Sequence, residues 1–365
     1  MAGDRPHTLL DKLRSLGQVD CDTFDVEVAR ELGPFVDCTS NQAIAYHELI
    51  RPSGITATTT SDEGKEPRLL HEQLIADSAS LASSLTGPEF DGVDKPELAV
   101  EVMMVKLALR IVPFLSGYSH VETNPRHAYD VEKTVRNARR IIAIFKALDP
   151  SYDAQNRVCI KIPATWEGMQ ACRELESSTP RIATLATTMF CKEQALLAAN
   201  VGCTYIAPYI NELRVHFDPG FVDEAKAFTF SATAQAYFDA HRPAIKTQVL
   251  PASLTSIQEV MMLAGSHHIT VSPPLLQKLA ETPADPWADI GLTGSAFTAA
   301  EVAEGARTWG GAEDEQVVRD EAAWKKAFGE SMGGRAEAKI VQAIRIFTEK
   351  QDGLEGIACD ALGRQ

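Results

Sequence analysis

The stretch "VCIKIPATWEGMQACREL", residues 158–175, places a short apolar run directly before a helical pattern. The run Val158–Ile162 is apolar and β-favouring except for Lys161, so it predicts a buried strand that carries one ammonium group. Side chains alternate along a strand, so Cys159 and Lys161 share the side opposite to the remaining apolar residues. A strand followed at once by a helix is the repeating unit of parallel α/β proteins.

The same alternation of strand and helix extends over most of the chain. Helical patterns lie between most of the apolar runs, for example over residues 130–148 and 254–265. Eight such alternations favour a closed parallel barrel over an open sheet, so we expect an α/β fold: a (β/α)8 TIM-type barrel with additional N- and C-terminal helices. The predicted strands are Gln18–Asp22, Phe35–Thr39, Tyr118–Glu122, Val158–Ile162, Ile182–Thr187, Tyr205–Pro208, Thr247–Pro251 and His268–Val271.

The chain is expected to form one domain over residues 1–365, with the barrel core over about 17–281. Helical patterns continue in residues 282–365, and no low-complexity linker separates them from the barrel. We therefore expect these helices to pack on the barrel. The segment Pro52–Pro67 is polar and rich in turn formers, which predicts a surface loop.

Composition and charge narrow the class of protein. The 365 residues are 45% hydrophobic, enough for a large core, and the net charge of −15 argues against nucleic acid or an anionic membrane as the main partner. Seven cysteines without a CxxC pair, and no signal-peptide pattern, predict a cytoplasmic protein with reduced thiols. The most apolar stretch, Leu98–Leu115, contains three charged residues, so it predicts a buried helix rather than a membrane span.

Lys161 is predicted at the carboxyl end of its strand, where the active sites of α/β barrels form. Burial there should lower the pKa of the amine, which would leave it neutral and able to attack a carbonyl to form a Schiff base. The alternative is a structural lysine that reaches the rim of the barrel or pairs with a carboxylate.

Four motifs together resemble the transaldolase family. They are "DCTSNQAI" at residues 37–44, "KIPATWEGMQACRELE" at 161–176, "IAPYI" at 206–210 and "ITVSPPLLQKL" at 269–279. The resemblance extends over roughly residues 9–281, and the Lys-Ile-x-x-Thr-Trp-x-Gly run is its most specific part. It implies a cytosolic (β/α)8 barrel that transfers a dihydroxyacetone unit between sugar phosphates. The family's essential lysine is on the fourth strand, where Lys161 is predicted.

The resemblance assigns roles to polar residues at the strand ends. Lys161 matches the Schiff-base lysine, and Asp22 matches the general acid/base aspartate that follows the first strand. Asn41 matches the asparagine that binds substrate hydroxyls, with Thr39 beside it. An imine on the lysine would act as the electron sink, and the carboxylate would take the proton of the hydroxyl at the bond being cleaved.

Three further residues concern the handling of protons. Glu122 and Thr187 match the glutamate and threonine that hold a proton-relay water in the family. Tyr209 lies where ordinary transaldolases usually carry phenylalanine and the related fructose-6-phosphate aldolases carry tyrosine. Its phenol would hydrogen-bond the catalytic water and favour release of the donor product over transfer. The alternative is a core aromatic residue with a satisfied hydroxyl.

Each of these residues also has a structural alternative. Asp22 could cap the helix that follows it, and Asn41 could cap the next one. Glu122 could pair with Arg126, and Thr187 could serve only as a β-former. The joint occurrence of the set at successive strand ends favours the catalytic interpretation.

The phosphate-binding positions depart from the family. Transaldolases hold the substrate phosphate with two arginines and a serine; Ser253 matches the serine, but Glu212 and Thr255 stand at the arginine positions. An anion at Glu212 would repel a phosphate, and the bidentate guanidinium contact would be missing. Arg214 and His216 follow shortly after and could substitute.

The sequence therefore predicts a Schiff-base enzyme that makes or breaks a carbon–carbon bond next to a ketone through Lys161, on a substrate other than the standard sugar phosphates. Two alternatives stay open: an ordinary transaldolase with a rearranged phosphate site, and an inactive barrel that serves as a binding partner. Imine chemistry needs neither cofactor nor metal, and the sequence has no cluster with metal-ligand spacing. The expected partners are small ketoses and aldehydes, and the sequence leaves the oligomeric state open, a homodimer included.

Overall fold

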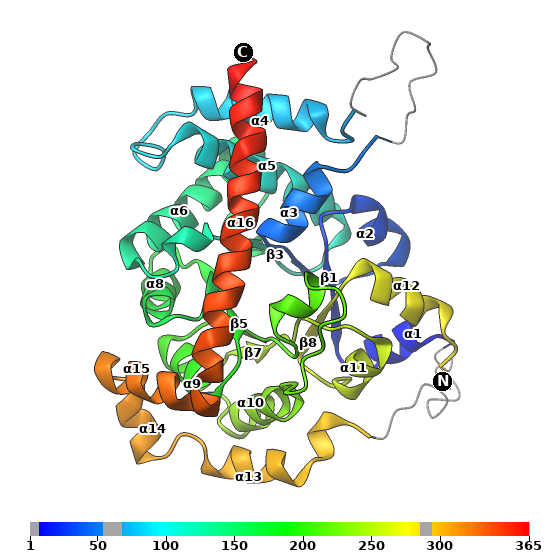
Figure 1. The fold of residues 1–365 in the computed structure, drawn as a ribbon, viewed down its shortest axis with the longest axis vertical. Helices are drawn as coiled ribbons and strands as arrows, with labels where there is room; N and C mark the ends of the chain where they lie inside the picture. The colour runs from blue at the N-terminus through cyan, green and yellow to red at the C-terminus, as the bar shows by residue number, and fades with distance from the viewer. Residues whose placement is uncertain (1–6, 54–67, 285–293, 365) are drawn as a thin grey trace.

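The computed structural model describes residues 7–53, 68–284 and 294–364, and its centre is a sheet of eight parallel strands (Figure 1). The strand order is β7-β6-β5-β4-β3-β2-β1-β8. The end strands approach each other where the Thr270 amide donates to the Pro251 carbonyl (3.3 Å). The predicted (β/α)8 barrel is confirmed. The strands are β1 Gln18–Asp22, β2 Cys38–Thr39, β3 Ser119–Glu122, β4 Val158–Pro163, β5 Ala183–Met189, β6 Tyr205–Pro208, β7 Gln248–Val249 and β8 His268–Val271.

The register of the strands places the predicted site residues at a similar height along the barrel axis. Asp22 is paired with Thr39 between β1 and β2, and Glu122 is paired with Lys161 between β3 and β4. Thr187 follows on β5, opposite Pro163. Paired residues of neighbouring parallel strands point to the same side of the sheet, so the register alone directs these polar side chains toward a common region.

Helices surround the barrel, and each strand is followed by at least one of them. Short 3₁₀ segments are η1 Val112–Phe114, η2 Pro125–His127, η3 Leu213–His216, η5 Ala296–Thr298 and η6 Ser331–Gly334. The α-helices are α1 Leu9–Arg14, α2 Val26–Leu32, α3 Gln42–Leu49, α4 Glu72–Ser84, α5 Lys95–Ile111, α6 Val131–Leu148, α7 Ala154–Arg157, α8 Trp166–Ser177, α9 Lys192–Val201, α10 Phe228–Ala240, α11 Ile257–Met262, α12 Pro273–Glu281, α13 Ala300–Thr308, α14 Ala312–Val317, α15 Glu321–Glu330 and α16 Arg335–Gly363.

The helix predicted over the most apolar stretch occurs as α5 and is buried between α4, α6 and α16. Its buried Glu101 forms an ion pair with Arg140 of α6. Nε and Nη2 of the arginine each donate to a carboxylate oxygen at 2.6 Å. Asn137 adds a third hydrogen bond to Glu101. Within the three described ranges, no helix is both long enough and apolar enough to cross a bilayer.

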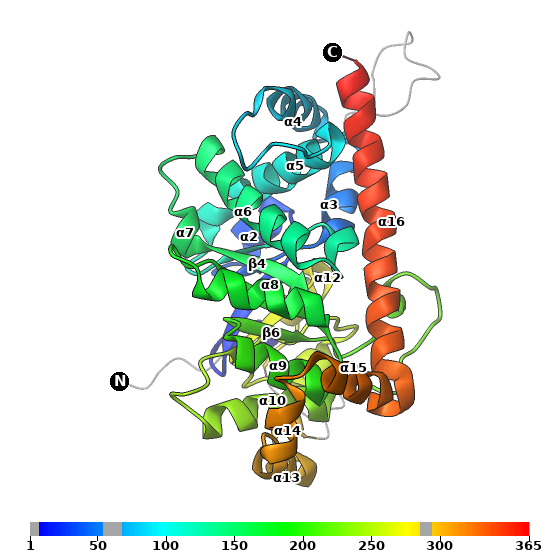
Figure 2. The same cartoon turned by 90° about the vertical axis from the view of Figure 1, so that its left-hand side faces the viewer.

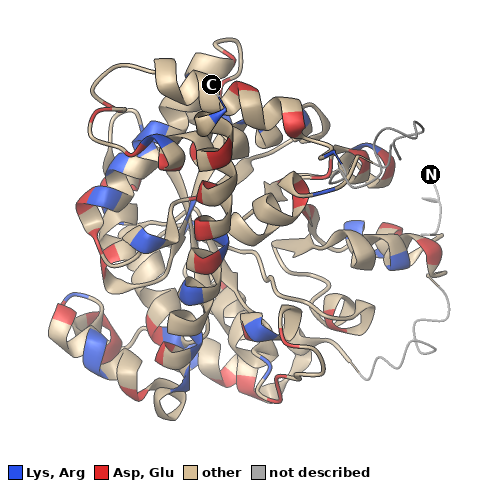
Figure 3. Ribbon diagram, turned by 45° about the horizontal axis from the view of Figure 1, so that its top comes forward, with Lys and Arg blue, Asp and Glu red and all other residues tan. Residues whose placement is uncertain are grey.

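The extra helices predicted at both ends are present. α1 packs against α12, and its N-cap Thr8 forms a capping box with Asp11. Of the predicted surface loop Pro52–Pro67, residues 54–67 lie outside the described part of the chain. Lysines and arginines are interspersed with acidic residues over the outer helices (Figure 3).

The long helix α16 lies across the carboxyl ends of the strands. It contacts α3, η2 and η3, and each of these segments follows the end of a strand. Figures 1 and 2 show it as one continuous rod that runs along a single side of the barrel. The helix therefore forms part of the wall around any site built at these strand ends.

Candidate active site

A cavity of about 520 Å³ opens at the carboxyl ends of the strands. This volume is in the range of small-molecule sites. Six residues predicted as site residues line it: Asp22, Thr39, Asn41, Lys161, Tyr209 and Ser253. Glu122 and Thr187 are buried behind this lining, and Arg214 does not line the cavity.

Lys161 is buried in the barrel interior, as the strand alternation predicted. Its Nζ donates a hydrogen bond to the Ser40 carbonyl (3.1 Å) and lies 3.3 Å from Oε2 of Glu122. Burial lowers the pKa of the lysine, but the nearby acidic groups of Tyr209, Glu122 and Asp22 outweigh burial and raise the pKa above its ordinary value. The expected fall in pKa is thus wrong for the free protein, because three acidic groups surround the amine.

Glu122 is the carboxylate paired with this lysine. Burial raises its pKa to about 7, although the nearby Lys161 charge acts in the opposite direction. Neither carboxylate oxygen accepts a hydrogen bond from the described residues. A buried carboxylate that titrates near neutral pH is suited to take and return protons. The alternative pairing with Arg126 is wrong, since Arg126 pairs with acidic residues of α16.

Asp22 lies at the end of a chain of hydroxyl hydrogen bonds. The Thr39 hydroxyl donates to Oδ1 of Asp22 (2.6 Å), and the Thr270 hydroxyl lies 2.6 Å from that of Thr39. The Thr39 hydroxyl has one hydrogen and donates it to Asp22, so the Thr270 hydroxyl is the donor in the bond between the two threonines. The N-cap alternative for Asp22 is wrong, because Asp25 caps α2 by accepting from the Glu27 amide.

Sequence reasoning missed Thr270, which lies on β8 just before the Ser-Pro-Pro turn and lines the cavity. The signal that could have found it is the strand alternation, which places Thr270 on the same side as His268.

The Asn41 side chain both caps a helix and lines the cavity. Its Oδ1 accepts from the Ile44 amide (2.9 Å) and caps α3, so the capping alternative is confirmed. The side chain also lines the cavity. Its Nδ2 remains a donor available to a substrate hydroxyl.

The side chains of Thr187, on β5, and Tyr209, just after β6, approach each other. The Thr187 hydroxyl lies 3.4 Å from the Tyr209 hydroxyl, a long and weak hydrogen bond. Burial raises the pKa of Tyr209 despite the Lys161 charge, so the phenol keeps its proton at neutral pH. Both side chains are buried, and Tyr209 is close enough to Lys161 for the lysine charge to affect its pKa.

The expected phosphate-binding residues are only partly brought together. Ser253 lines the cavity in a left-handed conformation (φ 59°), and its hydroxyl lies 2.9 Å from Nε2 of His216. Arg214 instead pairs with Asp218 and lies over the ring of Phe221 (4.2 Å), so it is not the substitute for a phosphate-binding arginine in this structure. The physical reason is local: both partners are within seven residues of Arg214 on the same surface segment.

The two positions that match the family's arginines also lie outside the cavity lining. Glu212 is approached by the Gln342 amide of α16 (3.4 Å). Thr255 donates to Glu259 from both its amide and its hydroxyl. Neither side chain is therefore in direct contact with the cavity.

Arg51 lines the cavity although sequence reasoning did not select it. Its Nη1 lies 2.8 Å from a carboxylate oxygen of Asp25 and 2.8 Å from one of Glu48. The sequence carries no motif for this ion-pair cluster, because it depends on the tertiary contact between α3 and the loop after β1.

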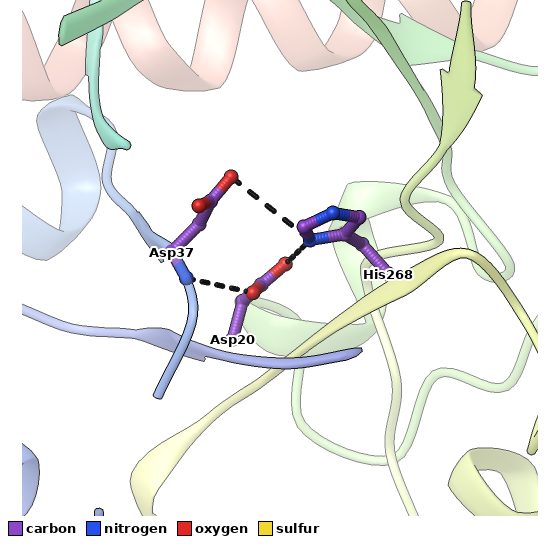
Figure 4. Close-up of side chains that lie close together, drawn as sticks. All are labelled: Asp20, Asp37 and His268. Atoms are coloured by element: carbon purple, nitrogen blue, oxygen red, sulfur yellow. Dashed lines mark hydrogen bonds and ion pairs between the residues drawn. The ribbon is translucent and has the colours of Figure 1, made fainter. Parts of the chain in front are cut away.

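A cluster of acidic and histidine side chains lies deeper in the barrel interior. Ligand atoms of Asp20, Asp37 and His268 are within 4.8 Å of one another (Figure 4), a grouping that sequence spacing did not reveal. Asp20 accepts from the Asp37 amide and pairs with His268 Nδ1. Asp37 accepts from the Tyr118 amide and pairs with His120 Nε2. All four carboxylate oxygens thus have hydrogen-bond partners, which explains the cluster as a polar layer that links β1, β3 and β8.

Comparison with known proteins adds family information to this geometry. Residues 19–338 match the family described as Transaldolase/Fructose-6-phosphate aldolase. A protein named Transaldolase from Gloeobacter violaceus is 28% identical over 98% of this chain and 82% of its own length. One with the same name from Thermosynechococcus vestitus is 30% identical with the same coverage. Another from Methylococcus capsulatus is 30% identical over 75% of this chain and 78% of its own length.

Proposed function

The chain belongs to the transaldolase/fructose-6-phosphate aldolase family, and on this premise we propose that it makes or breaks a carbon–carbon bond next to a ketone through a Schiff base on Lys161. The observation that carries the proposal is the buried Lys161 amine, which lines the cavity 3.3 Å from the Glu122 carboxylate. An amine can add to a bound ketone only after it loses a proton, and Glu122 is placed to take that proton.

The first stage is imine formation. Nζ attacks the ketone carbon, a carbinolamine forms, and loss of its hydroxyl as water leaves a protonated imine. Glu122, whose pKa is about 7, takes the proton of Lys161 and returns one to the departing hydroxyl. Thr187 and the Tyr209 phenol lie near the amine and can orient the water that leaves.

The second stage is cleavage of the carbon–carbon bond. Asp22 takes the proton of the hydroxyl on the carbon that becomes the aldehyde. The bonding electrons move into the imine and leave an enamine on Lys161. Thr39 and Thr270 fix the Asp22 carboxylate through their hydroxyl chain. The enamine then attacks an acceptor aldehyde, or it is protonated and hydrolysed to release the donor. Tyr209 favours protonation and hydrolysis of the enamine, because its phenol can supply the proton that the enamine carbon takes up.

A borohydride trapping experiment tests this proposal. The purified protein is incubated with dihydroxyacetone and sodium borohydride, and peptides are analysed by mass spectrometry. We expect the mass of the reduced adduct on the peptide that carries Lys161, and no adduct in Lys161→Met or in Lys161→Arg, whose guanidinium stays protonated. Lys325→Met, at an exposed lysine of α15, is the matched control and keeps the adduct. Absence of an adduct with every ketone tested would favour an inactive barrel that acts as a binding partner.

A second candidate is an ordinary transaldolase, which the names of the relatives favour. The residues around the cavity favour a substrate other than the standard sugar phosphates, because Arg214, Glu212 and Thr255 do not line it. Steady-state kinetics with fructose 6-phosphate and erythrose 4-phosphate separate the two. A kcat/KM of about 10⁴ M⁻¹s⁻¹ or more, the usual range of enzymes, would support the ordinary reaction.

A further inference from the structure

Apolar side chains line part of the cavity beyond the strand ends. Ile44 of α3 and Phe217 after η3 are half-buried and line it, and Phe24, Leu213 and Phe347 are buried in the same lining. These residues come from four segments beyond the strand ends, and Phe347 belongs to α16, which crosses this end of the barrel. The reacting groups Lys161 and Asp22 lie on β4 and β1, whereas these apolar residues lie on segments that follow the strands, so the apolar surface faces the part of a substrate that is remote from the reacting carbonyl.

The positive charges that line this cavity are already paired with carboxylates. Arg51 is held between Asp25 and Glu48 at 2.8 Å from each, so its charge is compensated within the protein. Lys161 is paired with Glu122 and is consumed when the imine forms. Among the described residues that line the cavity, no further lysine or arginine occurs.

The two histidines in the lining do not supply a strong positive charge. Burial lowers the pKa of His47, and the nearby Lys350 charge lowers it further. Burial also lowers the pKa of His216, whose Nε2 is engaged with the Ser253 hydroxyl (2.9 Å). Both rings are therefore neutral at pH 7.

We propose that the aldehyde that reacts with the Lys161 enamine in this cavity carries an apolar substituent and no phosphate. The inference rests on the proposed Schiff-base function and specifies its second substrate. The substituent would lie against Ile44 and Phe217, while the carbonyl is directed toward Lys161 and Asp22. The same class of compound would be the aldehyde released in the cleavage direction.

Elementary physical chemistry favours this class over a sugar phosphate. An apolar group gains free energy in proportion to the area it removes from water, and the half-buried Ile44 and Phe217 supply such area. A phosphate would lose its hydration without a free cation to replace it. A long polyol chain would also leave hydroxyls without partners wherever they lie against the apolar side chains.

One cation lies close to this region without lining it. The Lys350 ammonium of α16 is 4.9 Å from the centre of the Tyr46 ring and 5.6 Å from that of Phe217. Its position over two aromatic rings is a cation–π arrangement that stabilises the charge where it is. A phosphate captured by Lys350 at the cavity mouth is the main competing outcome, and the test below includes it.

The experiment has two steps. Borohydride trapping of dihydroxyacetone on Lys161 first establishes the enamine-forming reaction; without an adduct, the proposed function fails and so does this inference. With an adduct, dihydroxyacetone is the donor for three aldehydes: 3-phenylpropanal, glyceraldehyde and glyceraldehyde 3-phosphate. We expect kcat/KM for 3-phenylpropanal to exceed that for either other aldehyde by about tenfold or more. An adduct together with equal or faster reaction of glyceraldehyde 3-phosphate would overturn the inference and leave the proposed function intact.

Substitutions in the apolar surface test whether it causes the preference for 3-phenylpropanal. Phe217→Asn should lower the ratio of kcat/KM for 3-phenylpropanal over glyceraldehyde by about fivefold or more. Val222→Asn, an exposed apolar residue in the same loop that does not line the cavity, should leave this ratio within about twofold of the unmodified protein. Ile44→Thr keeps the branched shape and repeats the test if Phe217→Asn does not fold. An unchanged ratio in a folded variant that still forms the Lys161 adduct would overturn the inference.

Discussion

Asp22 and Glu122 approach the same amine from different strands, and their surroundings differ in a way that fits the two proton-transfer roles proposed for them. Asp22 is half-buried, lines the cavity and is fixed by the Thr39 hydroxyl. Glu122 is fully buried next to Lys161, and its pKa is raised to about 7. The half-buried position in the cavity lining suits a carboxylate that acts on the substrate, and the fully buried one suits exchange of protons with the lysine.

Asp22→Asn should separate imine formation from bond cleavage. The amide cannot take the proton of the substrate hydroxyl, so turnover should fall about 10²–10⁴-fold, the usual effect of removing a general base. The Lys161 adduct should still form with dihydroxyacetone and borohydride, because Asp22 takes no part in that stage. If trapping and turnover are lost together in a folded variant, Asp22 has a structural role instead.

The pH dependence of trapping should identify Glu122. The carboxylate form accepts the proton of Lys161, and this form increases as pH rises through the pKa of about 7. The trapping rate should therefore rise between about pH 6 and pH 8, with an apparent pKa that belongs to the coupled Lys161–Glu122 pair. Glu122→Gln should lower the rate and remove this inflection. An inflection that persists unchanged in Glu122→Gln would assign it to another group.

At the scale of elements, the packing of α5 depends on the ion pair that it shares with α6. Glu101 and Arg140 are both buried, and even with the arginine beside it, burial raises the pKa of Glu101 to about 7. A buried carboxylate that loses its partner still bears the desolvation penalty, without the attraction that compensated it. The two helices are therefore held together by a polar contact inside an apolar interface.

Arg140→Met should destabilise the protein by about 3–5 kcal/mol, the usual cost of breaking a buried pair by removing one partner. Urea unfolding followed by circular dichroism measures the loss. Arg139→Met is the matched control, since the neighbouring Arg139 pairs with Glu174 at the surface, where such pairs contribute about 0–1 kcal/mol. Equal losses in the two variants would contradict the role assigned to the buried pair.

The strands were predictable because each apolar run is short, β-favouring and followed by a helical pattern. Two of them were predicted three residues too long: β2 is limited to Cys38–Thr39 and β7 to Gln248–Val249, although the runs continue on one or both sides. Hydrogen bonding to the neighbouring strand sets these limits, and the sequence of a single strand does not contain that information. Phe35, for example, forms only an isolated bridge with Leu115 in the described structure.

The site was predictable to the extent that it lies at strand ends. The family motif located Lys161, Asp22 and Asn41, because these residues are close to turns with distinctive composition. The pKa of Lys161 and the position of Arg214 could not be obtained in this way. The pKa of Lys161 depends on which charged groups approach from other segments, and tertiary packing decides that. Arg214 is held by its sequence neighbours Asp218 and Phe221, and no motif shows those contacts.

At the scale of the whole molecule, α16 joins parts of the chain that are far apart in sequence. Its Lys339 is buried, and Nζ donates to Oδ2 of Asp223 at 2.7 Å. Asp223 also accepts from the Glu212 amide, so this contact connects α16 with the loop that carries Phe217. The position of the cavity wall thus depends on how α16 is attached to the barrel.

Lys339→Met should leave Asp223 buried without its cation and destabilise the protein by about 3–5 kcal/mol. Hydrogen exchange of residues 217–227 should become faster, because the loop loses its attachment to α16. Lys325→Met removes a partly exposed lysine paired with Glu167 and Glu321, and it should cost about 1 kcal/mol or less. Unchanged exchange in residues 217–227 of Lys339→Met would contradict the proposed attachment.

The placement of α16 also has a consequence for biosynthesis. A ribosome makes the chain from its amino end, so all eight strands are synthesised before Arg335–Gly363. A nascent chain can therefore assemble the barrel and the Lys161–Glu122 pair while the wall that contains Phe347 is still missing. Until that helix docks, the cavity around the Lys161 amine lacks one of its walls. Under the proposed Schiff-base function, selectivity for the substrate would then arise later in the life of the polypeptide than chemical reactivity.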